Sequence, residues 1–138
     1  MAPKRVNGGR EMHVRKFGWA LVLLLAGGFL QTAHADESWG AVAAGLWRDG
    51  SGTAHVAVGS GIRYPSKSAA EQEALHQCEM RGQNCEVVGT WNKDCGYIAP
   101  GSSDDGVHWG MAATEQGALN ECQAGGYECK NPIGGCVE

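Results

Sequence analysis

Hydrophobic and polar positions follow the same order twice along residues 36–138. Each time, two short apolar segments flank a turn rich in glycine, aspartate and serine, which predicts a β-hairpin. A segment with alanine, leucine and cysteine at helical spacing follows, and a further apolar segment closes the pattern. The sequence therefore predicts two helices, ending near Gly82 and Gly125, and strands at 39–47, 54–59, 85–91, 95–100, 107–111 and 129–137.

Polar residues mark the expected starts of both helices. Pro65 and Ser66 precede the first helix, and Ser68 with Glu71 has the spacing of a capping box. Thr114 is the expected N-cap of the second helix, because its hydroxyl can accept a hydrogen bond from an unpaired backbone N–H.

The repetition extends to individual residues and predicts an internal duplication. Gly-x-(Val/Ile)-Ala opens the copies at Gly40 and Gly96, and Ala-Leu-x-x-Cys recurs in both helices. We expect one α+β domain at 36–138, built as ββαβ–ββαβ from repeats of about 38–94 and 95–138. It would have a small antiparallel sheet, two helices, three disulfides and an approximate internal twofold.

All six cysteines lie in residues 36–138, and the repeat suggests their pairing. In both copies, the cysteine at the helix end is followed, after six intervening residues, by another cysteine, which suggests the equivalent local bridges Cys78–Cys85 and Cys122–Cys129. Cys95 and Cys136 remain and would join the first and last strands of the second copy. Trp39 aligns with Cys95, so we expect its packing to replace this bridge in the first copy.

Residues 1–35 have the features of a cleaved signal peptide. Five bases precede an uncharged segment at 17–30, and Ala33-His34-Ala35 supplies small residues for cleavage. The segment is shorter than the roughly 20 apolar residues that span a membrane. We therefore expect a secreted or periplasmic protein without a stable membrane anchor, in an oxidising compartment where disulfides persist.

Composition and charge restrict the partners. Residues 36–138 carry 6 of the 11 bases and 14 of the 15 acids, a net charge of −8. This charge opposes binding to nucleic acid and to anionic membranes, and favours a basic protein partner. Leu, Ile, Val and Phe total only 13 residues there, so disulfides and aromatic side chains have to supply much of the stability.

No assembled catalytic or metal-binding motif is present, and we expect no cofactor and no metal. Paired cysteines leave no thiolate for Cys/His catalysis, and Cys-x2-Cys zinc spacing is missing. Two alternatives remain open. His55 and His108 could meet across the twofold, and Asp104 and Asp105 with His108 could act as an acid/base set, although Asp-Asp-Gly is also an ordinary turn.

The segment that breaks the repeat is the candidate binding region. The first copy has 12 extra residues between its opening strand and its helix end, and aromatic anchors give binding surfaces their affinity. A binder should expose an aromatic patch near Trp47 and Tyr64, whereas an enzyme should gather its polar groups in a pocket. The candidate binding residues are Trp47, Arg48, Arg63, Tyr64, His108 and Trp109.

One set of segments forms a recognisable combined motif: Trp39-Gly40-Ala41-Val42-Ala43, Tyr64-Pro65-Ser66, Ala69-Ala70-Glu71, Ala74-Leu75 to Cys78, Cys85-Glu86-Val87-Val88 and Cys95-Gly96. Taken together, these segments resemble the domain of unknown function 4189 family of small secreted bacterial proteins. The resemblance covers about residues 38–136. It implies a secreted, disulfide-bonded, internally duplicated domain, and it brings no established catalytic residues.

We expect an exported, non-enzymatic binding module for a protein partner. The alternatives are an inhibitor or protective protein against a basic envelope hydrolase, a secreted effector that acts on host or neighbouring cells, and a small secreted hydrolase. The sequence does not determine the target or the oligomeric state.

Overall fold

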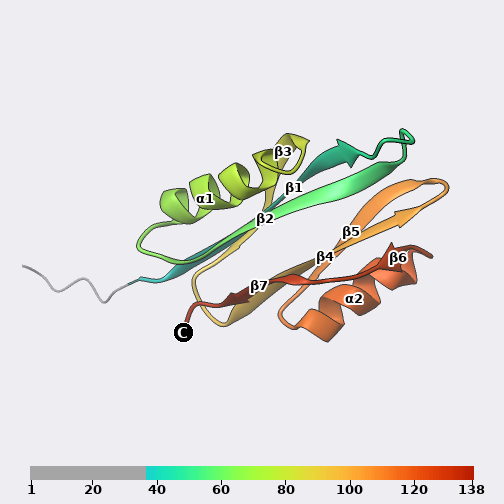
Figure 1. The fold of residues 1–138 in the computed structure, drawn as a ribbon. Coiled ribbons are helices and arrows are strands. Elements are labelled where there is room, and N and C mark those ends of the chain that lie inside the picture. The colour runs from blue at the N-terminus through green and yellow to red at the C-terminus, as the bar shows by residue number, and fades with distance from the viewer. Residues whose placement is uncertain (1–36) are drawn as a thin grey trace, which may run out of the picture. The chain divides into compact units, whose positions relative to one another are not determined.

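The computed structural model describes residues 37–138, which form two antiparallel sheets and two helices (Figure 1). Sheet A has the order β2-β1-β3. Sheet B has β4 in its centre, with β5 on one side and β6 and β7 on the other. The elements are β1 (Trp39–Arg48), β2 (Ala54–Tyr64), α1 (Lys67–Glu79), β3 (Gln83–Trp91), β4 (Cys95–Ser103), β5 (Gly106–Ala112), α2 (Glu115–Ala124), β6 (Glu128–Cys129) and β7 (Ile133–Cys136).

The elements stack in four layers, in the order α1, sheet A, sheet B, α2 (Figure 1). Alternate residues of β1 face opposite sides of the sheet, so Ala41 and Ala43 pack against α1 while Val42 and Ala44 pack between the sheets. Ile98 of β4 meets them there. The expectation of one small sheet is therefore wrong, because the central strands are apolar on both faces and need a second sheet to cover them.

Both helices lie directly against glycines of the edge strands. A Cβ atom at Gly59 of β2 would stand 2.1 Å from the carbonyl oxygen of Ala74. A Cβ at Gly110 of β5 would stand 2.4 Å from that of Ala118. Small residues, chiefly alanine and cysteine, form the helix sides of these interfaces. A chain poor in large aliphatic residues thus packs by bringing backbones close together.

The local signals at the helix and strand ends are partly confirmed. Thr114 is the N-cap of α2, and its hydroxyl accepts a hydrogen bond from Gly117 N at 3.0 Å. The N-cap of α1 is Ser66 rather than Ser68. The expected last strand is split into β6 and β7, because Pro132 has no N–H to donate and Asn131 adopts a positive φ of 49°.

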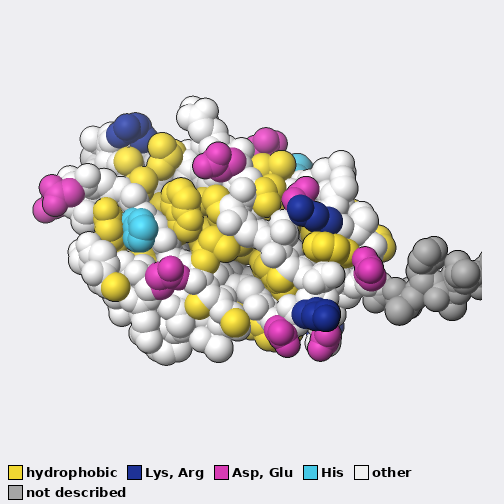
Figure 2. All heavy atoms as spheres, turned by 180° about the vertical axis from the view of Figure 1, so that it is seen from behind, with side chains coloured by type: hydrophobic (Ala, Val, Ile, Leu, Met, Phe, Trp, Pro, Cys, Tyr) yellow, Lys and Arg dark blue, Asp and Glu magenta, His cyan; other side chains and the backbone are white. Residues whose placement is uncertain are grey.

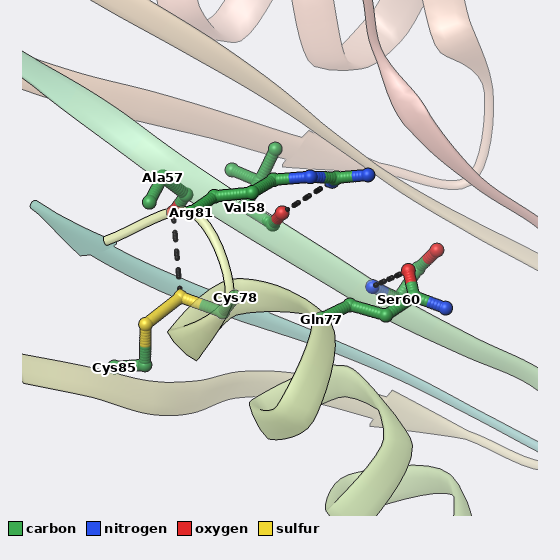
Figure 3. Close-up of a disulfide and its surroundings, with 7 residues drawn as sticks. All are labelled: Ala57, Val58, Ser60, Gln77, Cys78, Arg81 and Cys85. Carbon is green, nitrogen blue, oxygen red and sulfur yellow. Dashed lines mark hydrogen bonds between the residues drawn. A yellow bond between two sulfur atoms is a disulfide. The ribbon is translucent and has the colours of Figure 1, made fainter. Parts of the chain in front are cut away.

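Two of the three disulfides join a helix to the sheet it covers, and the third joins two neighbouring strands of sheet B. Cys78–Cys85 joins the end of α1 to β3 (Figure 3), and Cys122–Cys129 joins the end of α2 to β6. Cys95–Cys136 joins β4 to β7, where the two residues are direct partners in the strand register. These are the pairs that the repeated spacing suggested. Trp39 packs against the core beneath α1.

The expected signal peptide at 1–35 lies outside the described residues. Within residues 37–138, neither helix has the length and hydropathy of a membrane span. Figure 2 shows the side opposite to that of Figure 1, where hydrophobic side chains gather across the middle of the face and charged side chains surround them.

Candidate functional site

The structure separates the two aromatic residues that the sequence placed in one patch. Trp47 is paired with His55 near one end of the β1–β2 hairpin, and Tyr64 is paired with Trp39 at the other. Eight residues of strand at roughly 3.3 Å each put about 26 Å between the two ends. Tyr64 is half-buried against the core beneath α1. Trp47 and Tyr64 therefore form no common patch, and the segment holds two separate surfaces.

Arg63 belongs to the Tyr64 end. Its Nε donates a hydrogen bond to the carbonyl oxygen of Cys136 at 3.2 Å, and its backbone adopts a positive φ of 63°. Its side chain is exposed, and the contact ties the end of β2 to β7.

The neighbouring residues His108 and Trp109 of β5 have ring centroids 6.4 Å apart and make different further contacts. The His108 ring stacks on Tyr127 with 4.9 Å between ring centroids, while Trp109 packs into the core between the sheets. Asp104 and Asp105 are exposed at the tip of the β4–β5 hairpin. Within residues 37–138, His108 makes no hydrogen bond to either carboxylate, so the expected acid/base set is not assembled.

The expected two-histidine site is also not formed. His55 contacts Trp47 and Asp49, whereas His108 contacts Tyr127. In the described part of the chain, no three His, Cys, Asp or Glu side chains are grouped as a metal ion would require.

Trp47 is the most distinctive residue of the predicted set. It is 40% exposed and its neighbour Leu46 is 38% exposed, which is unusual in a chain with so few large apolar side chains. The His55 ring stacks on Trp47 with 4.3 Å between centroids and an interplanar angle of 19°. The indole is therefore held as a flat, partly exposed platform.

Asp49 fixes the other side of His55. Since an ionised carboxylate can only accept, His55 donates Nε2–H to Asp49 Oδ2 at 2.9 Å. Asp49 Oδ1 accepts from the N–H groups of Ser51 and Thr53 at 2.9 and 3.0 Å and from the Ser51 hydroxyl. Bonds from the Ser51 hydroxyl, and next from His55, hold the pKa of Asp49 well below its usual range. Asp49, ionised, thus organises the hairpin tip that carries Trp47.

Two cavities adjoin Trp47. The larger, about 530 Å³, lies where the ends of β1 and α1 meet the start of β3. The smaller, about 290 Å³, lies between this hairpin and β4 with the segment from Glu128 to Asn131. The larger cavity is lined by Leu46, Trp47, Arg48, Arg81, Gly82, Gln83 and Asn84.

The two arginines of the larger cavity are held by backbone carbonyl groups. Arg48 Nη1 donates to Gly52 O, and Arg81 Nη1 donates to Val58 O, each at 2.8 Å. A guanidinium has five N–H donors, so each arginine keeps donors for a ligand. In the region that the structure describes, the ion pairs are His55–Asp49 and Lys67–Glu71, and neither arginine takes part in one.

Sequence reasoning found Trp47 and Arg48 but missed Arg81. Figure 3 shows Arg81 and Gln77 reaching the outer edge of β2. Gln77 Oε1 accepts from Ser60 N at 3.4 Å, and Arg81 follows Gln77 by one helical turn. A basic residue at a helix end is a common signal. Its proximity to Trp47 depends on the pairing of Leu46 with Gln83, which the sequence pattern did not give.

The fold and this surface define a small, disulfide-bonded α+β protein with one exposed aromatic and cationic end. Residues 39–136 match the family described as Domain of unknown function (DUF4189), and the chain therefore belongs to this family. No curated protein and no solved structure matches the chain.

Proposed function

We propose that this chain is an exported, non-enzymatic binding module that contacts a protein partner with the surface around Trp47. We call this surface, made of Leu46, Trp47, Arg48, Met80 and Arg81, the Trp47 surface. Its main support is the exposed Trp47 indole beside two arginines, because Trp and Arg are the residue types that most often dominate binding energy in protein interfaces.

The internal contacts of the Trp47 surface favour tight binding. His55 stacking and the Asp49 turn hold Trp47, and carbonyl groups hold both arginines. Side chains that are already ordered lose less conformational entropy when a partner binds. Met80, the C-cap of α1 and the neighbour of Arg81 in the sequence, is 66% exposed and adds an apolar side chain at this helix end.

We also infer that the two halves are copies of one ββαβ unit related by an approximate twofold. Equivalent glycines make equivalent contacts, as Gly59 and Gly110 do beneath the two helices. A Cβ at Gly45 would stand 2.6 Å from the sulfur of Cys85, and one at Gly101 would stand 2.7 Å from the sulfur of the equivalent Cys129.

The edge strands add a second pair of equivalent contacts. Gln77 of α1 accepts from Ser60 N of β2, and Glu121 of α2 accepts from Met111 N of β5 at 2.8 Å. In both halves a helix side chain thus covers a free N–H at the sheet edge, as proteins do to avoid edge pairing. These shared contacts support duplication of a scaffold.

When the two halves are aligned at Gly40 with Gly96 and at Cys78 with Cys122, the Trp47 surface has no counterpart in the second half. Small or acidic residues occupy every equivalent position, so neither an aromatic platform nor a positive charge is repeated. A duplicated scaffold does not require this difference, which supports a specialised role for the first half. Leu46, Trp47, Arg48, Met80 and Arg81 align with Ser102, Ser103, Asp104, Ala124 and Gly125.

Export is part of the proposal. Three disulfides are consistent with an oxidising environment, and residues 1–35 have the composition of a cleaved signal peptide. The net charge of −8 supports a basic partner only for faces other than the Trp47 surface, where two arginines set the local charge.

The experiment is a pull-down with oxidised protein, purified after export of the full chain, from envelope extracts, culture medium and host-cell extracts. The matched control is the Leu46→Ser, Trp47→Ser, Arg48→Asp variant, which puts the second-half residues at these positions. We expect a partner that the unmodified protein retains, that the variant releases, and whose purified form binds in the same way. A partner that binds both proteins equally would overturn the assignment to the Trp47 surface.

A further inference from the structure

We propose that the Trp47 surface binds an acidic peptide segment, with its carboxylates on Arg48 and Arg81 and an apolar side chain on Leu46 and Trp47. The inference rests on the proposed function and adds the chemistry of the partner. The proposed ligand is acidic, whereas the net charge of the chain led to the expectation of a basic partner.

The charge around the larger cavity carries the argument. Acids outnumber bases more than twofold in residues 37–138, yet the seven residues that line this cavity include two arginines and no acid. Within the described residues, each guanidinium is bonded to a carbonyl oxygen and to no carboxylate. An anionic ligand would complete the hydrogen bonding of both groups without displacing an existing ion pair.

The carbonyl anchors also suit carboxylate recognition. The planar guanidinium presents paired N–H groups that match the two oxygens of a carboxylate. The bonds from Nη1 to Gly52 O and Val58 O restrict the orientation of each group before binding. Two fixed guanidinium groups on one cavity favour a ligand with two or more carboxylates.

Edge strand β3 favours a peptide over an acidic saccharide. The cavity includes Gln83 and Asn84, the first residues of β3, which lies at the outside of sheet A. An edge strand offers backbone N–H and C=O groups that pair with an extended peptide. The cavity volume of about 530 Å³ lies within the range of small-ligand sites, roughly 300–1,000 Å³.

The test measures fluorescence anisotropy with oxidised, exported protein and labelled eight-residue peptides. One peptide alternates glutamate with valine, a second alternates lysine with valine, and an oligogalacturonate serves as an acidic saccharide probe. We expect binding of the glutamate peptide that weakens with added salt, because screening reduces the attraction between exposed charges. Arg48→Gln and Arg81→Gln should each reduce affinity by about tenfold or more, as expected for loss of a charge-assisted hydrogen bond.

Arg63→Gln is the matched control, since Arg63 is also exposed and also bonded to a carbonyl oxygen, at the far end of the hairpin. It should change affinity by less than about twofold. Arg81→Lys keeps the charge and a donor, and should retain part of the binding even if the edge of β2 loosens. In NMR spectra, the Trp47 indole N–H signal, assigned with Trp47→Phe, should shift on adding the glutamate peptide.

Four outcomes would overturn the inference. Tighter binding of the lysine peptide would contradict its charge, and tighter binding of the oligogalacturonate would contradict its ligand class. An equal loss of affinity in Arg63→Gln would contradict its location. If the glutamate peptide fails to bind while a partner captured from extracts depends on Trp47, the inference is wrong and the proposed function stands. If no captured partner depends on Trp47, the proposed function fails as well.

Discussion

The half formed by β1, β2, α1 and β3 and the half formed by β4, β5, α2, β6 and β7 share interior contacts and differ at the surface. In both, a helix packs on a glycine of the edge strand and a disulfide joins the helix end to the following strand. Only the first half carries an exposed tryptophan with two arginines, Trp47 with Arg48 and Arg81, where the ends of β1 and α1 meet the start of β3. The difference teaches that both halves are held together by close backbone packing and a helix–strand disulfide, while their exposed ends differ in side-chain chemistry.

Removing the disulfides should give the largest effects. Replacing Cys95 and Cys136 together with alanine should cost about 4 kcal/mol of unfolding free energy, because the closed loop is long. Either local bridge, with a sequence separation of 7 residues, should cost about 2.5 kcal/mol. Urea unfolding followed by circular dichroism measures all three. The unfolding free energy lost on removing Cys78–Cys85 should equal that lost on removing Cys122–Cys129 within about 1 kcal/mol. A larger difference would show that the two bridges do not play equivalent parts in the two halves.

Gly59→Ala and Gly110→Ala should rank next. An added methyl group at either position meets helix backbone, which cannot rotate aside as a side chain can. Overpacking of this kind costs about 2–3 kcal/mol, and the two variants should have similar losses in thermal unfolding. Gly50→Ala is the control, because nothing lies within 4 Å of its Cβ position, and it should stay within about 0.5 kcal/mol of the unmodified protein.

The hydrogen bonds at the sheet edges should separate the two halves by a smaller amount. Glu121→Ala should cost about 1 kcal/mol, because a carboxylate accepts from Met111 N at 2.8 Å. Gln77→Ala should cost about 0.5 kcal/mol, because its bond to Ser60 N is neutral and longer, at 3.4 Å. Amide exchange of Met111 and Ser60 reports each bond directly. A larger increase in the exchange rate of Ser60 in Gln77→Ala than of Met111 in Glu121→Ala would reverse this ranking.

Much of the fold could be predicted because the repeat supplied information that single motifs lack. The duplicated Cys-x6-Cys spacing reduced the disulfide pairings to one plausible set, and the Thr114 cap followed from local chemistry. The number of sheets was not predictable in the same way. Alternation in β1 between Ala41 and Val42 shows that both faces are apolar, but does not say which strands cover them.

The candidate site could be predicted only in part, for a geometric reason. Trp47 and Arg48 were identified because they lie in or beside the segment in which the repeated sequence pattern differs between the two halves. Tyr64 was grouped with them by closeness in sequence, yet β2 runs the full length of the sheet and carries it to the far end. Arg81 was missed because it reaches Trp47 only through the fold.

Asp49→Asn should give the smallest effect and the clearest dependence on pH. The depressed pKa means that the folded state favours the ionised carboxylate. The stabilisation is therefore complete above the ordinary value of 3.8, declines as the pH falls below it, and is lost only as the pH passes through the lowered pKa of the folded state. The melting temperature of the unmodified protein should exceed that of the variant at neutral pH, and the gap should narrow progressively on acidification below the ordinary value of 3.8. Ser51→Ala, which removes the strongest of the bonds to Asp49, should narrow the gap only in part. A gap that widens on acidification would show that the Asp49 turn does not hold the hairpin tip. In that case, the rigidity that distinguishes the Trp47 end from the Asp104 end would need another source, with His55 stacking on Trp47 the remaining contact.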